Sequence, residues 1–230
     1  MTRHTKRTLD EFIHDFFHPF EARARREEAE RKEHAERKAR EEYGKKMEQR
    51  THRELHKLTR RGTYYVFHDL PTFNAGNIDH LVVGPEGITL VETKGNRGTV
   101  EGVQHRNGGV EITVGGNPLH RNLRNQIRAQ MWDVCKSAGM KTGPDDTFGM
   151  NWIVCFPNGE LGHGLPENLN AHVATTADLP EKLRAPGRVM DDAMVESVAS
   201  AVSTIYERPP SATPVRRPPD IGPEGRHYER

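Results

Sequence analysis

One stretch of the chain, residues 21–46, consists almost entirely of Glu, Arg, Lys and Ala. From Glu27 to Glu42, six Glu residues each precede a Lys or Arg by four positions, the spacing at which two side chains meet on a helix. No apolar stripe accompanies these charges, so the helix is polar on every side and has no face to bury. We therefore expect a charged helical arm that stands in solvent. A nucleic-acid-binding arm is a weaker alternative, because acidic residues nearly match basic ones here.

The segments on either side of the arm differ from it in composition. Before it, six apolar residues recur at helical spacing and would form one face of a short helix: Leu9, Phe12, Ile13, Phe16, Phe17 and Phe20. This face predicts packing, either onto the protein's own domain or in a homo-oligomer or partner contact. At the other end, residues 208–230 contain six prolines and several arginines, which predicts a disordered tail. The expected organisation is a helical arm (1–43), a folded domain (44–207) and a tail (208–230).

The charges of the whole chain nearly cancel, with 34 Lys and Arg residues against 33 Asp and Glu residues. This balance excludes a uniformly basic nucleic-acid wrapper but is compatible with a local basic face. No apolar run reaches the roughly 18 residues of a membrane-spanning helix, and residues 1–10 lack the apolar core of a secretory signal. Two cysteines, Cys135 and Cys155, cannot form a disulfide framework. We expect a reduced, cytoplasmic protein in which both cysteines are packing residues.

The central region alternates between helical and strand-like patterns. Helices are predicted where apolar residues recur every three or four positions, near 45–60, 122–138 and 191–206. Strands are predicted in the apolar runs between turn-forming residues, at 64–70, 78–83, 88–94, 99–103, 110–114, 152–156 and 172–175. This order of elements is typical of an α/β or α+β domain with a central sheet.

Two neighbouring strands of this pattern carry residues that could perform chemistry. The runs 78–83 and 88–94 are joined by a short Gly-Pro turn, so antiparallel pairing would bring Asp79, near the start of the first, beside Glu92, near the end of the second. Glu92 and Lys94 are two residues apart and therefore project from the same face of their strand. Two carboxylates and one ammonium group are thus expected to converge at one edge of the sheet.

Such a group suits the hydrolysis of phosphodiester bonds. Paired carboxylates bind a hard divalent cation such as Mg²⁺, which keeps waters and a substrate phosphate in its other coordination positions. The cation activates a water and offsets charge in the transition state, while Lys94 can position that water and neutralise the phosphate. The alternative is an ordinary cross-strand salt bridge, because Glu-x-Lys is a common sequence.

The same residues resemble a known domain family. The run from Asn77 to Pro85, followed by Gly87 and the Val-Glu-Thr-Lys sequence at 91–94, resembles the NERD (nuclease-related) domain of the PD-(D/E)xK nuclease superfamily. The resemblance covers about residues 44–140. It implies an α/β fold of the restriction-endonuclease-like kind, a central mixed sheet flanked by helices. It also implies nuclease activity that depends on Mg²⁺ or Mn²⁺, with DNA as the expected substrate.

The resemblance suggests further site residues. Residues 44–50 are similar to the opening of the family's first helix, with Met47 in place of a glycine, which makes Glu48 the candidate acid of that helix. A later helix of the family carries a Gln, for which Gln126 is the better match and Gln130 the rival. The implied catalytic set is Asp79, Glu92, Lys94, Glu48 and Gln126, with Asp79, Glu92 and Glu48 as metal ligands.

Other residues near this centre are open to two interpretations. Arg121, Arg124 and Arg128 share one face of the predicted helix 122–138, where they could contact phosphates or form a solvated basic face. His80 lies next to Asp79 on the opposite face of its strand and is expected to be structural. None of the 13 histidines shows paired metal-ligand spacing, so zinc is not expected.

The sequence therefore predicts a metal-dependent nuclease whose partner is nucleic acid and which has no association with a membrane. One alternative is a non-catalytic nucleic-acid-binding or protein-interaction module on the same fold. Another is a scaffold in which the charged arm and the Phe-rich segment before it perform the function.

Overall fold

The computed structural model describes most of the chain between residues 19 and 210. The described residues are 19–60, 63–73, 75–104, 110–119, 123–137, 149–162, 165, 172–207 and 209–210. For a few of these, Arg124 among them, the backbone is described but the side chain is not. The chain divides into two compact units, residues 1–45 and 46–230, and each is described by itself.

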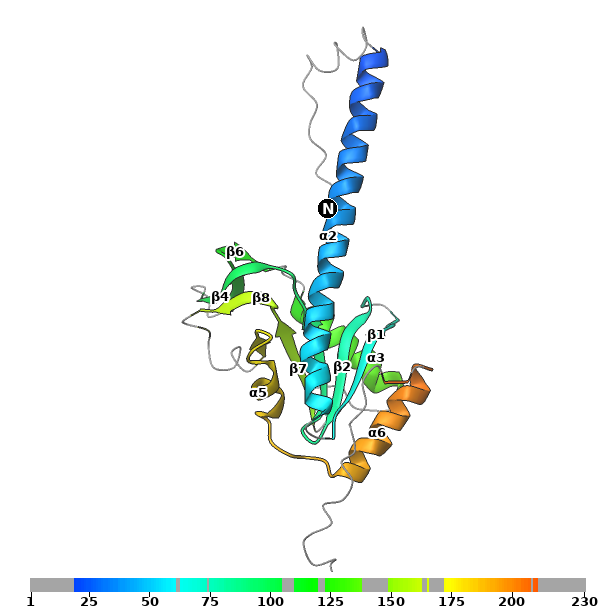
Figure 1. Ribbon diagram of the computed structural model, residues 1–230, viewed down its shortest axis with the longest axis vertical. Helices are drawn as coiled ribbons and strands as arrows, with labels where there is room; N and C mark the ends of the chain where they lie inside the picture. The colour runs from blue at the N-terminus through cyan, green and yellow to red at the C-terminus, as the bar shows by residue number, and fades with distance from the viewer. Residues whose placement is uncertain are drawn as a thin grey trace, which may run out of the picture. The chain divides into compact units, whose positions relative to one another are not determined.

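The first unit contains the N-terminal part of a long helix, α2 (Pro19–Thr59), whose remainder belongs to the second unit (Figure 1). The described side chains from residue 20 to 42 are exposed on every side of the helix. Ion pairs link successive turns, as between Arg23 Nε and Glu27 Oε1 at 2.8 Å. The predicted polar helix is confirmed. Of the apolar stripe predicted before it, Phe20 is described and exposed, and the other members lie outside the described residues.

The second unit is built on a five-stranded sheet with the strand order β1-β2-β3-β7-β9. Its strands are β1 (Tyr65–Leu70), β2 (Ile78–Gly84), β3 (Gly87–Thr93), β7 (Met150–Cys155) and β9 (Val173–Ala174). The first three strands pair antiparallel, and β7 and β9 then continue the sheet in parallel. The sheet is therefore mixed, and the β2–β3 hairpin lies near its middle.

The turn between β2 and β3 depends on a close approach of two backbones. Gly87 has a φ of 108°, and a Cβ at this position would lie 1.9 Å from the carbonyl oxygen of Gly149. The backbone N–H of Ile88 donates to that same oxygen at 2.7 Å. A side chain cannot be accommodated here, so glycine is required both for the space and for the backbone conformation.

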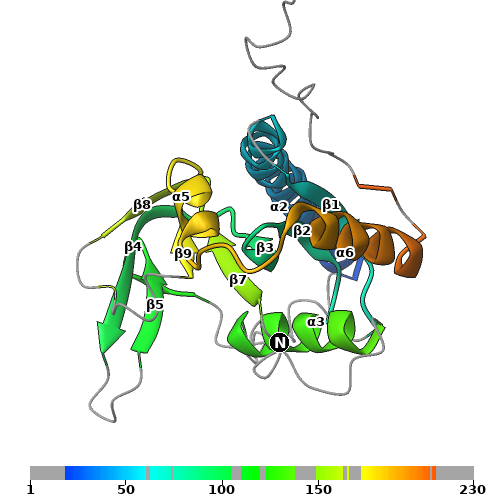
Figure 2. The same cartoon turned by 90° about the horizontal axis from the view of Figure 1, so that it is seen from below.

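Helices cover both faces of the five-stranded sheet (Figure 2). The second part of α2 packs on one face together with α5 (Leu179–Arg184). The other face is covered by α3 (Leu123–Ser137) and α6 (Asp192–Ile205). The neighbours Leu81 and Val82 belong to different cores, Leu81 to that of α3 and α6 and Val82 to that of α2 and α5. This division follows from the alternation of side chains along a strand.

A second sheet of four strands has the order β6-β5-β4-β8. Its strands are β4 (Arg97–Gln104), β5 (Val110–Val114), β6 (Asn117–Pro118) and β8 (Asn158–Leu161). β4 follows β3 along the chain, β8 follows β7, and β4 and β8 pair in parallel. The sequence pattern predicts β4 and β5 but not their separation into a sheet of their own, because alternation does not say which strand pairs with which.

The mixed α/β fold with a long N-terminal helix and flanking helices is as predicted. Each predicted strand is present, with ends shifted by at most two residues, whereas β6, β8 and α5 were not predicted. Neither cysteine forms a disulfide, and both are buried, as expected of packing residues. Within the described ranges, no helix combines the length and apolar character needed to cross a membrane. The predicted tail, apart from residues 209 and 210, lies outside the described residues.

Candidate active site

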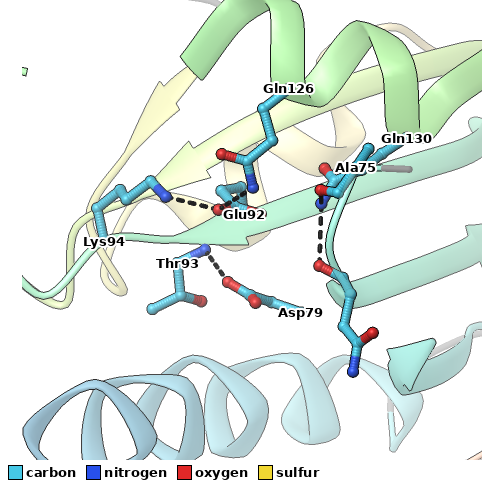
Figure 3. A network of polar contacts seen from close by, with 8 residues as sticks. Ala75, Asp79, Glu92, Thr93, Lys94, Gln126 and Gln130 are labelled. Atoms are coloured by element: carbon cyan, nitrogen blue, oxygen red, sulfur yellow. Dashed lines mark hydrogen bonds and ion pairs between the residues drawn. The ribbon is translucent and has the colours of Figure 1, made fainter. Parts of the chain in front are cut away.

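The β2–β3 hairpin brings the predicted acids to one end of the sheet. His80 pairs with Val91, so continuing this register by one residue sets Asp79 opposite Glu92. The Asp79 carboxylate accepts a hydrogen bond from the backbone N–H of Thr93 at 2.7 Å (Figure 3). The acid of β2 is thereby held against the end of β3.

Glu92 is the centre of the group. The residue is only 3% exposed. Its carboxylate oxygen Oε1 accepts hydrogen bonds from the Lys94 ammonium group at 2.6 Å and from the Gln126 amide at 3.2 Å (Figure 3). The other oxygen, Oε2, is buried and has no hydrogen-bond partner among the described residues. Burying a polar atom without a partner is unfavourable, so a cation or a donor at this oxygen would be stabilising.

Lys94 lies between this buried acid and the solvent. Its side chain is 25% exposed, against 4% for the side chain of Glu92. Its backbone N–H donates to the carbonyl of Cys155 at 2.8 Å and so joins the ends of β3 and β7. The ion pair requires the side chains of Glu92 and Lys94 to lie on the same face of the strand.

Asp79 is placed where its charged form is disfavoured. Burial, and next the Glu92 carboxylate, raise the pKa of Asp79 to about 7, against the opposing effect of the Thr93 N–H. Glu48 on α2 adds to the rise in this pKa, and the Lys94 ammonium group reduces it. The negative charges of Glu92 and Glu48 thus affect the pKa of Asp79 more than the positive charge of Lys94 does. A divalent cation would supply the missing positive charge.

The two glutamines of α3 have different partners. Gln126 contacts the Glu92 carboxylate, as above. Gln130, about one turn later, is fully buried and donates to the backbone carbonyl oxygens of Asn77 at 2.9 Å and Ala75 at 3.5 Å (Figure 3). Gln130 therefore holds the loop that leads into β2 and Asp79. Of the two rivals, Gln126 is the one that contacts an acid.

This group of residues falls within a known domain. Residues 43–155 match the family model of the nuclease-related domain, NERD. The chain carries a NERD domain. The matched region begins in α2 and ends with β7, so it includes every acid, amide and ammonium group described above. No curated protein and no solved structure gives a significant match to the chain.

For the other predicted residues of the NERD domain, the structure describes no direct contact with Asp79 or Glu92. Glu48 is half-buried on α2, and its negative charge helps to raise the pKa of Asp79. Arg121 lies outside the described residues, the side chain of Arg124 is not described, and Arg128 is exposed on α3. Contact of these three arginines with phosphate stays a prediction.

The donor set of the NERD domain can be compared with the needs of a metal ion. Nowhere in the described part of the chain do three or more His, Cys, Asp or Glu side chains gather as a metal site. Mg²⁺, however, is usually held by one or two carboxylates, with waters and phosphate oxygens as its other ligands. Asp79 and Glu92 offer two carboxylates, one with a buried oxygen that no described residue hydrogen-bonds. These two carboxylates suit an open site, where a hard cation keeps waters or phosphate oxygens as ligands, better than a site in which protein ligands enclose the cation.

Two threonines were not singled out by the sequence pattern. The Thr93 hydroxyl donates to Thr51 Oγ1 of α2 at 3.1 Å, and Thr51 donates to the carbonyl of Met47 at 3.3 Å. This chain of bonds ties the end of β3 to the helix that carries Glu48. Strand alternation could have indicated Thr93, because a residue between Glu92 and Lys94 must point to the opposite face.

His80 is fully buried, and its ring lies among those of two other histidines. The ring centroids are 6.0 Å from His52 of α2 and 4.9 Å from His68 of β1. Burial, and then the two neighbouring imidazoles, lower the pKa of His80 well below its ordinary value, so the ring is neutral. His68 Nδ1 lies 2.8 Å from the carbonyl oxygen of Asp79. The histidines therefore support the backbone at Asp79 from the face that packs on α2.

Proposed function

We propose that this chain is a metal-dependent phosphodiesterase that cleaves nucleic acid, with DNA as the first substrate to test. The observation that carries the proposal is the Glu92 carboxylate. It is buried, bound on one oxygen by Lys94 and Gln126, and without a partner on the other within the described part of the chain. A structural salt bridge would be expected to satisfy a buried oxygen. The NERD match supports the same assignment.

The acids have the first role in this proposal. Asp79 and Glu92 would hold a Mg²⁺ or Mn²⁺ ion, with Glu48 as the third acid. When bound, such an ion supplies Lewis acidity toward water and the scissile phosphate. The Thr93 N–H positions Asp79, and the Gln126 amide positions Glu92. Both carboxylates are therefore oriented before substrate arrives, which lowers the reorganisation that the reaction requires.

Lys94 is the group that would meet the phosphate. Its ammonium group has three N–H donors, of which Glu92 accepts one. Because the Lys94 side chain is 25% exposed, the remaining donors can turn toward a phosphate oxygen and the attacking water without breaking the ion pair. The positive charge would stabilise the negative charge that develops on the phosphate.

A second candidate function is nucleic-acid binding without cleavage. It is favoured by the absence, among the described residues, of a cluster of three potential metal ligands, since Asp79 and Glu92 are a pair. In that case nucleic acid should bind without being cut, and Asp79→Asn should leave the affinity unchanged.

The experiment that tests the nuclease proposal is nicking of supercoiled plasmid DNA by the full chain with Mn²⁺ or Mg²⁺, and with EDTA as the metal-free control. Glu92→Gln and Lys94→Met should each reduce the rate at least about 100-fold. Glu101→Gln, which changes an exposed acid on β4, is the matched control and should cut at the rate of the unaltered chain.

Far-UV circular dichroism of each variant separates a loss of chemistry from a loss of fold. Equal nicking by the unaltered chain and both site variants would show that the activity comes from elsewhere. Failure of the unaltered chain to cleave both the plasmid and a single-stranded DNA, with either metal, would also contradict the proposal.

A further inference from the structure

A large aromatic side chain stands in solvent in the loop that precedes Asp79. Phe73, in the loop between β1 and β2, is 73% exposed. An exposed ring contributes little of the hydrophobic stabilisation that a buried one does, so folding does not explain its presence here. The same loop leads directly into the strand that carries Asp79.

Hydrogen bonds link the described residues of this loop to α3 and to one another. The backbone N–H of Phe73 donates to Asp133 Oδ2 of α3 at 3.0 Å. The Thr72 hydroxyl donates to the carbonyl of Gly76 at 2.6 Å and accepts from the N–H of Ala75 at 3.0 Å. The backbone of Phe73 is therefore anchored to α3, and Thr72 before it is bonded to Ala75 and Gly76.

One basic side chain lies near the ring, on the same helix as the Asp133 carboxylate that binds the Phe73 backbone. Lys136 Nζ lies 5.8 Å from the centroid of the Phe73 ring. Arg128, Trp132 and Lys136 follow one another at intervals of four residues on α3, so they share its exposed face, and Trp132 is 46% exposed. Aromatic rings interleaved with basic side chains are the means by which proteins bind single-stranded nucleic acid.

The position of Phe73 relative to Glu92 can be gauged along α3. Gln126 binds Glu92, and Asp133, seven residues later, binds the backbone of Phe73. Seven residues of α-helix span about 10 Å. A strand with its phosphate at Glu92 could thus bring a nearby base to Phe73.

We propose that Phe73 is a base-stacking platform and that the substrate is single-stranded, or unpaired close to the point of cleavage. This inference rests on the function proposed above. Within a duplex both faces of each base are covered by its neighbours, so a base must be unstacked before the Phe73 ring can contact it. Lys136 would attract the phosphate next to that base.

Fluorescence anisotropy of a labelled oligonucleotide tests the platform, with the same sequence offered as a single strand and as a blunt duplex. All proteins carry Glu92→Gln so that binding is measured without cleavage. Phe73→Ala should weaken binding of the single strand by about fivefold or more, as expected from the loss of one base–aromatic stack. Phe73→Tyr keeps the ring, and Met194→Ala removes a comparably exposed side chain on α6, so both should stay within about twofold. Affinity for the duplex should not change.

The outcomes separate this inference from the proposed function. Equal single-strand affinity of Phe73→Ala and its parent overturns the platform, while metal-dependent nicking by the unaltered chain would leave the nuclease function standing. Weaker binding by Phe73→Ala, with no metal-dependent cleavage of either plasmid or single-stranded DNA by the unaltered chain, supports the platform and overturns the nuclease. A lower oligomeric mass for Phe73→Ala with unchanged affinity assigns the ring to a contact between copies and overturns the platform.

Discussion

Replacing Lys94 should destabilise the folded chain as well as stop cleavage. Lys94→Met keeps a long side chain but removes the ammonium group that lies 2.6 Å from Glu92 Oε1. The Glu92 carboxylate would then be buried, with the Gln126 amide as its remaining side-chain donor among the described residues. The stability of the variant therefore measures how strongly the acid depends on Lys94.

The size of the loss follows from the exposure of the two side chains. Removing one partner of a buried ion pair lowers stability by about 3–5 kcal/mol, whereas an exposed pair contributes about 0–1 kcal/mol. The side chain of Glu92 is 4% exposed and that of Lys94 is 25% exposed, so the pair is closer to the buried case. The hydrogen bond from Gln126 offsets part of the loss. We expect the free energy of unfolding to fall by about 2–3 kcal/mol.

Urea denaturation at neutral pH in EDTA measures this effect without a bound cation. The double variant Glu92→Gln/Lys94→Met should be more stable than Lys94→Met alone, because it leaves no unpaired buried charge. The two single variants and the double variant complete a cycle whose coupling energy should be about 1–3 kcal/mol. A Lys94→Met protein as stable as the unaltered chain, or a double variant no more stable than Lys94→Met, would refute this reasoning.

The remaining predictions concern alkaline stability, thiol reactivity and the β2–β3 turn. Burial above all raises the pKa of Tyr64 to about 12. Because the unfolded phenol ionises near pH 10, this group should lower the free energy of unfolding by about 1.4 kcal/mol per pH unit between about pH 10 and 12. Urea denaturation across that range should show a shallower fall for Tyr64→Phe, and equal slopes would contradict the prediction. Burial raises the pKa of the Cys155 thiol to about 12, and Cys135 is also buried, so a disulfide reagent should react far faster with the unfolded chain than with the native one. Rapid reaction of either native thiol would argue against this packing. Gly87→Ala should lower the free energy of unfolding by at least about 2 kcal/mol, because its Cβ would meet a backbone carbonyl. Gly116→Ala, which also has a positive φ but open space around it, should lose less in the same denaturation assay, and equal losses would show that the close approach is unimportant.

The sequence by itself determined the elements of the main sheet and the acids that they carry. Alternating apolar residues specify a strand locally, and a four-residue turn leaves two adjacent strands little choice but to pair antiparallel. The convergence of Asp79, Glu92 and Lys94 follows from that pairing, since all three lie in or next to one hairpin. The charged helix was equally predictable, because a helix without an apolar face has nothing to bury.

Only the tertiary structure decided which distant residues meet this hairpin. Periodicity shows which face of α3 is buried, but not how the helix is rotated or where it lies along the strands. The choice between Gln126 and Gln130 was therefore open until their contacts with Glu92 and Asn77 were known. The short strands β6 and β8 and the helix α5 escaped prediction because two to six residues contain too little pattern. Phe73 gains its significance in the same way. Its sequence neighbours mark only a loop, and it is the hydrogen bond to Asp133, sixty positions away, that anchors its backbone to the helix that also carries Gln126.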